Sequence, residues 1–144
     1  MTPPPTPLRT RPWSAWVLAV VEAFIAYQAV AGGIALIDDR WEMSREWLQR
    51  TPFDTWTGPG WVLITLIGIP QALAALVIVV VVVDARLAVL AGFLAGASLL
   101  VWIAIQLALL QVFFFLQPVI AVAGLIEIGL AWWWRRRIDA RRTA

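Results

Sequence analysis

The chain has 144 residues, of which 62% are hydrophobic and 14% are charged, and its formal net charge at pH 7 is +2. A soluble domain usually has about 45–50% apolar and about 25% charged residues, so this composition predicts a protein whose solvent is lipid. All eleven basic residues are Arg, and there is no Lys, His or Cys. These absences exclude disulfides, thiolate nucleophiles, Cys/His zinc sites, haem histidine ligands and an imidazole base.

The chain begins with a Pro-rich segment, residues 1–12, which is predicted to be a disordered cytoplasmic tail. Four prolines lie close together in it: Pro3, Pro4, Pro5 and Pro7. Such spacing favours an extended, polyproline II-like backbone. The segment is too short to be a convincing ligand for an SH3-type domain.

Four apolar stretches are long enough to cross a membrane, which takes about 20 mostly apolar residues. They are residues 13–37, 60–83, 87–110 and 112–134. The first contains one charged residue, Glu22, and the fourth contains one, Glu127. Backbone groups in lipid must be hydrogen-bonded within the protein, so each stretch is predicted to be a helix. The fold class expected for residues 13–134 is an all-α membrane protein, a four-transmembrane-helix bundle.

The first span has an alternative interpretation as a cleaved signal peptide. Arg9 and Arg11 would form its basic region, and residues 29–31 (Ala-Val-Ala) resemble a small-residue cleavage site. The apolar stretch continues to Ile37, which is long for a signal peptide. The four-helix prediction therefore keeps this span, and a mature chain beginning at Gly32 would contradict it.

Arginine positions predict the orientation, because cytoplasmic loops of membrane proteins carry an excess of Lys and Arg. Eight arginines lie on one side of the predicted membrane: Arg9, Arg11, Arg86, Arg135, Arg136, Arg137, Arg141 and Arg142. The loop 38–59 on the other side has three arginines against five acids: Arg40, Arg45, Arg50, Asp38, Asp39, Glu42, Glu46 and Asp54. Both termini and the turn 84–86 are therefore expected in the cytoplasm, in a multi-pass protein of the plasma (inner) membrane.

Tryptophans and the C-terminal tail agree with this orientation. Aromatic residues favour the membrane interfaces, and the expected levels are inner for Trp13, Trp16 and residues 132–134 and outer for Trp56 and Trp61. The basic tail, residues 135–144, is expected to contact anionic lipids, with about 1 kcal/mol per Arg near the surface. The arginines that would do so are Arg135, Arg136, Arg137, Arg141 and Arg142. Nucleic-acid binding is not expected.

The outer loop 38–59 is predicted to contain a short amphipathic helix from about Asp39 to Arg50, capped by Asp39 and ended before Pro52. Such a helix would lie on the outer leaflet or cover the bundle, or it would dock a partner. Within the spans, Pro70 is expected to kink the second helix. Pro118 offers an alternative start for the fourth, which would place the Phe-rich segment 113–115 at the outer interface.

Two glutamates inside the spans are the main candidates for a functional site, because ionisable groups in a membrane are costly and face the bundle interior. With a rise of 1.5 Å per residue, Glu22 is about 14 Å and Glu127 about 12 Å from the inner ends of their helices. No basic residue lies in the spans, so the pair is expected to share a proton, with at least one carboxyl neutral at pH 7. The candidate intramembrane polar site is Glu22, Tyr27, Gln28, Gln71 and Glu127.

Three interpretations of this pair stay open. Each protonated Glu could form a hydrogen bond to Tyr27, to a Gln or to a backbone carbonyl and so hold neighbouring helices together. The pair could instead be a proton relay or cation site, or one acid could face a partner subunit. Small residues share a face with the polar ones on every span, which favours one compact bundle. These residues are Ala26, Ala29, Gly33, Gly68, Ala75, Ala88, Gly92, Ala95, Gly96, Ala121 and Gly124.

Nearer the outer side, Trp102 and Gln106 lie four residues apart on one face of the third span, and Gln117 is expected at a similar height. These three residues form a candidate outer pocket under the loop. Ordinary interhelical hydrogen bonding is the alternative. No metal site or cofactor is predicted.

Several short motifs resemble a group of small four-span membrane proteins from actinobacteria and other bacteria. They are Gly32-Gly33, Glu46-Trp47-Leu48 followed by Pro52-Phe53, Gly60, Trp102 with Gln106, and Leu116-Gln117-Pro118. The resemblance covers roughly residues 32–124 and implies the four-span fold but no reaction. In architecture alone, the chain is also similar to DoxX-like four-helix proteins.

The leading function expected from these features is a non-enzymatic scaffold or accessory subunit, with a protein partner or a second copy. One alternative is a small proton- or cation-coupled transporter that uses Glu22 and Glu127. The other is a lipid- or quinone-binding protein that uses Trp102, Gln106 and Gln117. The chain has no nucleophile–base pair, metal motif or phosphate loop, so an enzyme is not expected.

Overall fold

The structure is a computed structural model that describes residues 11–80 and 84–140. These residues form only helices, turns and loops, with no β-strand among them. Four helical rods, each long and apolar enough to cross a membrane, confirm the predicted helical architecture. They are α1 (Trp13–Ile37), the continuous α2 (Thr57–Leu63), η2 (Ile64–Gly68) and α3 (Ile69–Val79), α4 (Ala85–Leu110) and α5 (Leu116–Ala140).

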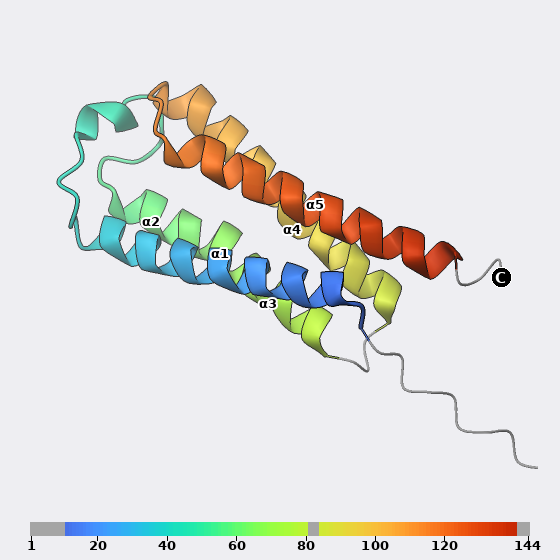
Figure 1. The fold of residues 1–144 in the computed structure, drawn as a ribbon. Helices are drawn as coiled ribbons and strands as arrows, with labels where there is room; N and C mark the ends of the chain where they lie inside the picture. The colour runs from blue at the N-terminus through green and yellow to red at the C-terminus, as the bar shows by residue number, and fades with distance from the viewer. Residues whose placement is uncertain (1–10, 81–83, 141–144) are drawn as a thin grey trace, which may run out of the picture.

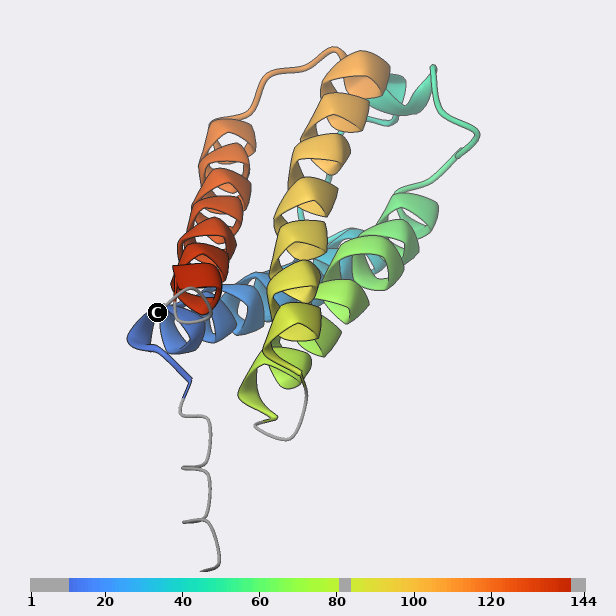
Figure 2. The same ribbon diagram turned by 90° about the vertical axis from the view of Figure 1, so that its right-hand side faces the viewer.

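The four rods pack in a closed ring. The α1 helix contacts α2 and α3, α3 contacts α4, α4 contacts α5, and α5 returns to α1. The start of α1, the end of α3, the start of α4 and the end of α5 lie at one end of the bundle, here called the basic end (Figure 1). The loops 38–56 and 111–115 lie at the opposite end, here called the loop end (Figure 2). The two termini of the described bundle are therefore at the same end.

Glycine pairs set two of the helix contacts. A Cβ on Gly33 of α1 would lie 2.7 Å from the carbonyl oxygen of Gly60 on α2, and a Cβ on Gly60 would lie 2.6 Å from that of Gly33. The same reciprocal contact joins Gly96 on α4 to Gly124 on α5. Nearly all of the small residues expected on the inner faces are buried, so the prediction of a bundle packed through small residues is confirmed.

The second rod continues through Pro70 because the helical turn just before the proline is wider than an α-helical turn. The segment η2 is one turn of π-helix, in which the Ile69 N–H bonds the carbonyl of Ile64, five residues back. Proline has no N–H, and its ring crowds the preceding turn. A π-turn just before the proline relieves that crowding within one helix. The structure thus has a π-turn before Pro70, where a kink was predicted.

The outer-loop helix predicted from Asp39 to Arg50 is wrong. Asp39 and Glu42 have left-handed backbones, with φ of 52° and 45°, which no α-helix allows. Only one turn of 3-10 helix forms, η1 (Arg45–Leu48), and the Ser44 hydroxyl accepts a hydrogen bond from its Glu46 N–H at 3.3 Å. Asp39 instead follows the C-terminus of α1, and its N–H bonds the Leu36 carbonyl.

Aromatic contacts tie this loop to the bundle. Trp47 makes edge contacts with Trp56 at 6.4 Å and with Phe114, in the other loop, at 5.2 Å between ring centroids. The Trp56 indole N–H donates to the Met43 carbonyl at 3.0 Å. Trp56 is thus a buried anchor at the loop end, whereas Trp41 is exposed. These contacts hold the loop 38–56 against the bundle at the loop end.

The fourth rod differs from its predicted bounds at both ends. Gln111 has a left-handed backbone (φ 51°) that ends α4, and a non-helical link follows before α5 begins at Leu116. The helix then continues past Trp134 through the arginines to Ala140, because Arg is a good helix former. Arg136 lies over Trp132 and Arg137 over Trp133, at 4.0 and 5.6 Å. Arg141, Arg142 and most of the Pro-rich tail lie outside the described residues.

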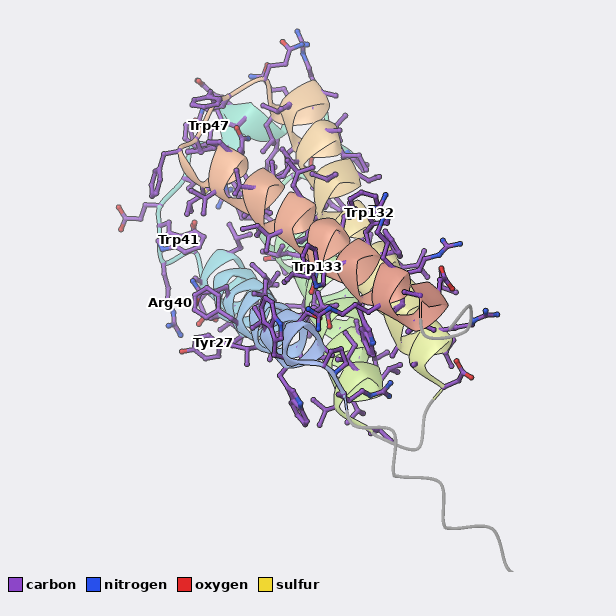
Figure 3. All side chains as sticks on the ribbon, turned by 45° about the vertical axis from the view of Figure 1, so that its right-hand side comes forward. Tyr27, Arg40, Trp41, Trp47, Trp132 and Trp133 are labelled. Carbon is purple, nitrogen blue, oxygen red and sulfur yellow. The ribbon has the colours of Figure 1, made fainter. Side chains whose placement is uncertain are left out.

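Arg11 fastens the start of α1 to the basic end. Its Nη2 donates to the Val80 carbonyl at 2.9 Å, and its guanidinium lies 5.2 Å from the ring centre of Trp134. Burial lowers the pKa of Arg11, and the carboxylate of Asp84 opposes that shift. Trp134 is 2% exposed, so it is a core residue, unlike the outward-facing Trp132 and Trp133 beside it (Figure 3).

Candidate functional site

Three polar side chains from three helices are fully enclosed in the middle of the ring. Glu22 on α1, Gln71 on α3 and Glu127 on α5 are each 0% exposed, and we call them the carboxyl cluster. Each lies on the small-residue face of its helix, so the packing that brings the backbones together also encloses the polar group. Glu22, Gln71 and Glu127 were all predicted members of the intramembrane site, and all three face the core.

The fourth helix, α4, provides the space for this cluster. A Cβ on Gly92 would lie 3.5 Å from Oε1 of Glu22, and a Cβ on Gly96 would lie 3.1 Å from Cβ of Glu127. Gly92 and Gly96 are one helical turn apart, so the two carboxyls occupy neighbouring levels along α4. The prediction that they lie near one level is therefore confirmed.

One amide connects three of the helices. Nε2 of Gln71 donates to Oε2 of Glu127 at 3.1 Å and to the Ala95 carbonyl of α4 at 3.3 Å. A primary amide nitrogen has two hydrogens, so both are used. Gln71 thus joins α3 to α4 and to α5, which makes it an interhelical bridge.

The carboxyl cluster has more acceptors than donors. Oε1 and Oε2 of Glu22, Oε1 of Glu127 and Oε1 of Gln71 have no hydrogen-bond partner among the described residues. An unpaired acceptor in an apolar interior costs about 1–3 kcal/mol, and a buried unpaired charge costs more. Protons on the carboxyls, or a small cation between them, would supply the missing positive partners.

Two predicted members of the site lie elsewhere. Tyr27 is 69% exposed and faces outward from α1 (Figure 3), and Gln28 is also exposed. Five and six residues after Glu22, they are turned to other sides of a helix with 3.6 residues per turn. The suggestion that Tyr27 bonds a glutamate is wrong, because neither oxygen of Glu22 has a partner and Glu127 is bonded by Gln71.

Two of the three residues of the predicted outer pocket, Gln117 and Trp102, have structural contacts. Gln117 is buried, and its side chain closes its own loop: Oε1 accepts from the Phe114 N–H at 3.1 Å and Nε2 donates to the Val112 carbonyl at 3.2 Å. Trp102 packs against the apolar cluster formed by Ala29, Ile67 and Leu99. Gln106 is partly buried. The polar groups of Gln117 are therefore engaged by the backbone of the link before α5.

A pocket that was not predicted lies at the basic end between α4 and α5. Its volume is about 290 Å³, and it is lined by Arg86, Val89, Leu90, Phe93, Arg135, Ile138 and Asp139. The four α4 residues follow the i, i+3, i+4, i+7 spacing of one helix face, a pattern visible in the sequence. The other side of the pocket is formed by the end of α5. The predicted span ended at residue 134, so it did not include this part of the helix.

Comparison with known proteins supplies no family for this chain: no protein-family model, curated protein or solved structure matches it. The resemblance to small four-span bacterial proteins and to DoxX-like proteins stays a prediction.

Proposed function

We propose that the chain is a multi-pass protein of the plasma membrane with both termini in the cytoplasm. Four apolar rods support this topology, because the start of α1 and the end of α5 lie at the basic end with the described Arg11, Arg86 and residues 135–137 (Figure 1). The chain has no Cys, so single cysteines report accessibility directly. An impermeant thiol reagent added to intact cells should label Thr55→Cys and spare Ala140→Cys until the membrane is opened. The reverse pattern would contradict the orientation.

We propose further that the protein is a non-enzymatic scaffold or accessory subunit. The observation that carries this is the enclosure of the carboxyl cluster, which leaves the sides of the rods to apolar residues. The Glu127 carboxyl, bonded by Gln71, holds α3 and α5 together there, and the outward-facing apolar sides meet lipid or another helix. A protein with that role should co-purify with a stoichiometric membrane partner, or with a second copy, after mild crosslinking in native membranes. Recovery of a single unaccompanied chain would contradict it.

Proton- or cation-coupled transport is the second candidate, and the two unpartnered oxygens of Glu22 favour it. A carboxyl without a fixed donor can exchange a proton or hold a cation. In proteoliposomes with an imposed pH gradient, the full chain should then acidify a trapped pH dye. The double variant E22Q/E127Q should abolish the signal, and E46Q in the outer loop should leave it intact. Absence of flux through the unaltered chain, or full flux through the double variant, would remove this candidate.

A further inference from the structure

The pocket between the ends of α4 and α5 joins two kinds of surface. One part is basic, with Arg86 from α4 and Arg135 from α5. The rest is mostly apolar, with Leu90 and Phe93 continuing along α4 toward the middle of the rod and Ile138 facing them from α5. A ligand that fits both parts has an anionic group attached to a hydrocarbon portion.

The charges of this pocket are incompletely balanced. Asp139 is its one lining carboxylate, and it lies 3.9 Å from Arg135, at the limit of an ion pair between exposed groups. The guanidinium of Arg86 has no carboxylate partner in the part of the chain that the structure describes. Two cations therefore share one acid, and the pocket has a net positive charge. A ligand with a charge complementary to that of the pocket is therefore an anion.

Other arginines at the basic end have aromatic or backbone partners. Arg136 and Arg137 lie over Trp132 and Trp133, and Arg11 is bonded to Val80. Arg86 and Arg135 are instead the pair that lines a cavity. Arg136 and Arg137 therefore serve as matched controls, because they have the same charge at the same helix end and do not line the pocket.

We propose that this pocket binds one anionic phospholipid, with its phosphate between Arg86 and Arg135 and an acyl chain along Leu90 and Phe93. A volume of about 290 Å³ accommodates a headgroup and the beginning of a chain, while the remaining chain runs along the apolar sides of the rods. Arginine binds phosphate through paired hydrogen bonds. This inference rests on the proposed membrane insertion and adds a defined site to general attraction between the basic tail and the bilayer.

The test uses native mass spectrometry of the purified full chain in a neutral detergent, with added phosphatidylglycerol, phosphatidylcholine or inorganic phosphate. One phosphatidylglycerol should remain bound, and R86Q/R135Q should lower its apparent affinity about tenfold or more, as expected for the loss of two arginine–lipid contacts. R136Q/R137Q should lower it clearly less, because Arg136 and Arg137 lie over Trp132 and Trp133 and do not line the pocket. Far-UV circular dichroism checks that each variant is folded. If the double variant does not fold, the single variant R86Q carries the same comparison.

Three results would overturn the proposal. Equal loss in R86Q/R135Q and R136Q/R137Q would mean that surface charge alone attracts the lipid. Equal retention of phosphatidylcholine would mean that the pocket does not recognise the anionic headgroup. Saturation by inorganic phosphate with displacement of the lipid would assign the site to a soluble anion. The cysteine-labelling experiment tests membrane orientation separately, so failure of the lipid site and failure of the topology are distinguishable.

Discussion

Gly96 on α4 and Gly124 on α5 bring two helix backbones into direct contact, and Gly96→Ala tests that contact. The added Cβ would lie 2.6 Å from the Gly124 carbonyl oxygen, 2.8 Å from Cγ1 of Ile128 and 3.1 Å from Cβ of Glu127. The nearest of these atoms is backbone, so the helices must separate. Overpacking of this kind costs about 1–3 kcal/mol, and the better helix propensity of Ala returns up to about 1 kcal/mol. The expected net loss is therefore up to about 2 kcal/mol.

Gly129→Ala is the matched control, because a Cβ at this α5 position meets nothing within 4 Å. The control keeps the propensity gain and lacks the clash, so it should be neutral or more stable by up to about 1 kcal/mol. The assay is reversible unfolding in mixed detergent micelles, followed by far-UV circular dichroism. If the stability of G96A equals or exceeds that of G129A, the close α4–α5 contact and the position of Glu127 derived from it are wrong.

Three further substitutions test other contacts by the same unfolding assay. Gln71→Leu removes both donated bonds and should cost about 1–3 kcal/mol, whereas Gln28→Leu on the outward face should change stability by less than about 0.5 kcal/mol; equal effects would contradict the bridge. Trp47→Ala removes two edge contacts, each worth about 0.5–1.5 kcal/mol, so it should destabilise far more than the exposed Trp41→Ala, and the opposite order would refute the loop anchor. Arg11→Gln should cost about 1 kcal/mol through its lost bond to a carbonyl, and an unchanged unfolding midpoint would show that the start of α1 is fastened otherwise.

Much of the fold could be predicted because hydropathy alone identifies helices of membrane length. The bounds of α1 matched, since a proline precedes it and two acids follow it. The outer loop could not be predicted by helix periodicity. Its conformation depends on left-handed turns at Asp39 and Glu42 and on tertiary contacts of Trp47 and Trp56, which no local pattern encodes.

The candidate site was predictable where helix geometry decided it and not where side-chain contacts did. The spacing of Glu22 and Glu127 from the helix ends placed both at one level, and the small-residue faces placed Gln71 with them. Tyr27 was grouped with Glu22 by nearness in sequence, although helical rotation separates the two. The role of Gln117 depended on the non-helical link before α5, whose start the apolar pattern placed too early.

We infer that protons complete the acceptor-rich carboxyl cluster, which four apolar rods enclose. Infrared spectroscopy of the full chain in lipid at pH 7 tests it directly, because a protonated carboxyl has a C=O stretch distinct from the bands of a carboxylate. We predict a protonated-carboxyl band that weakens or disappears in E22Q or in E127Q and persists in E46Q. A spectrum with only ionised carboxylate bands, unchanged by E22Q and E127Q, would contradict the claim.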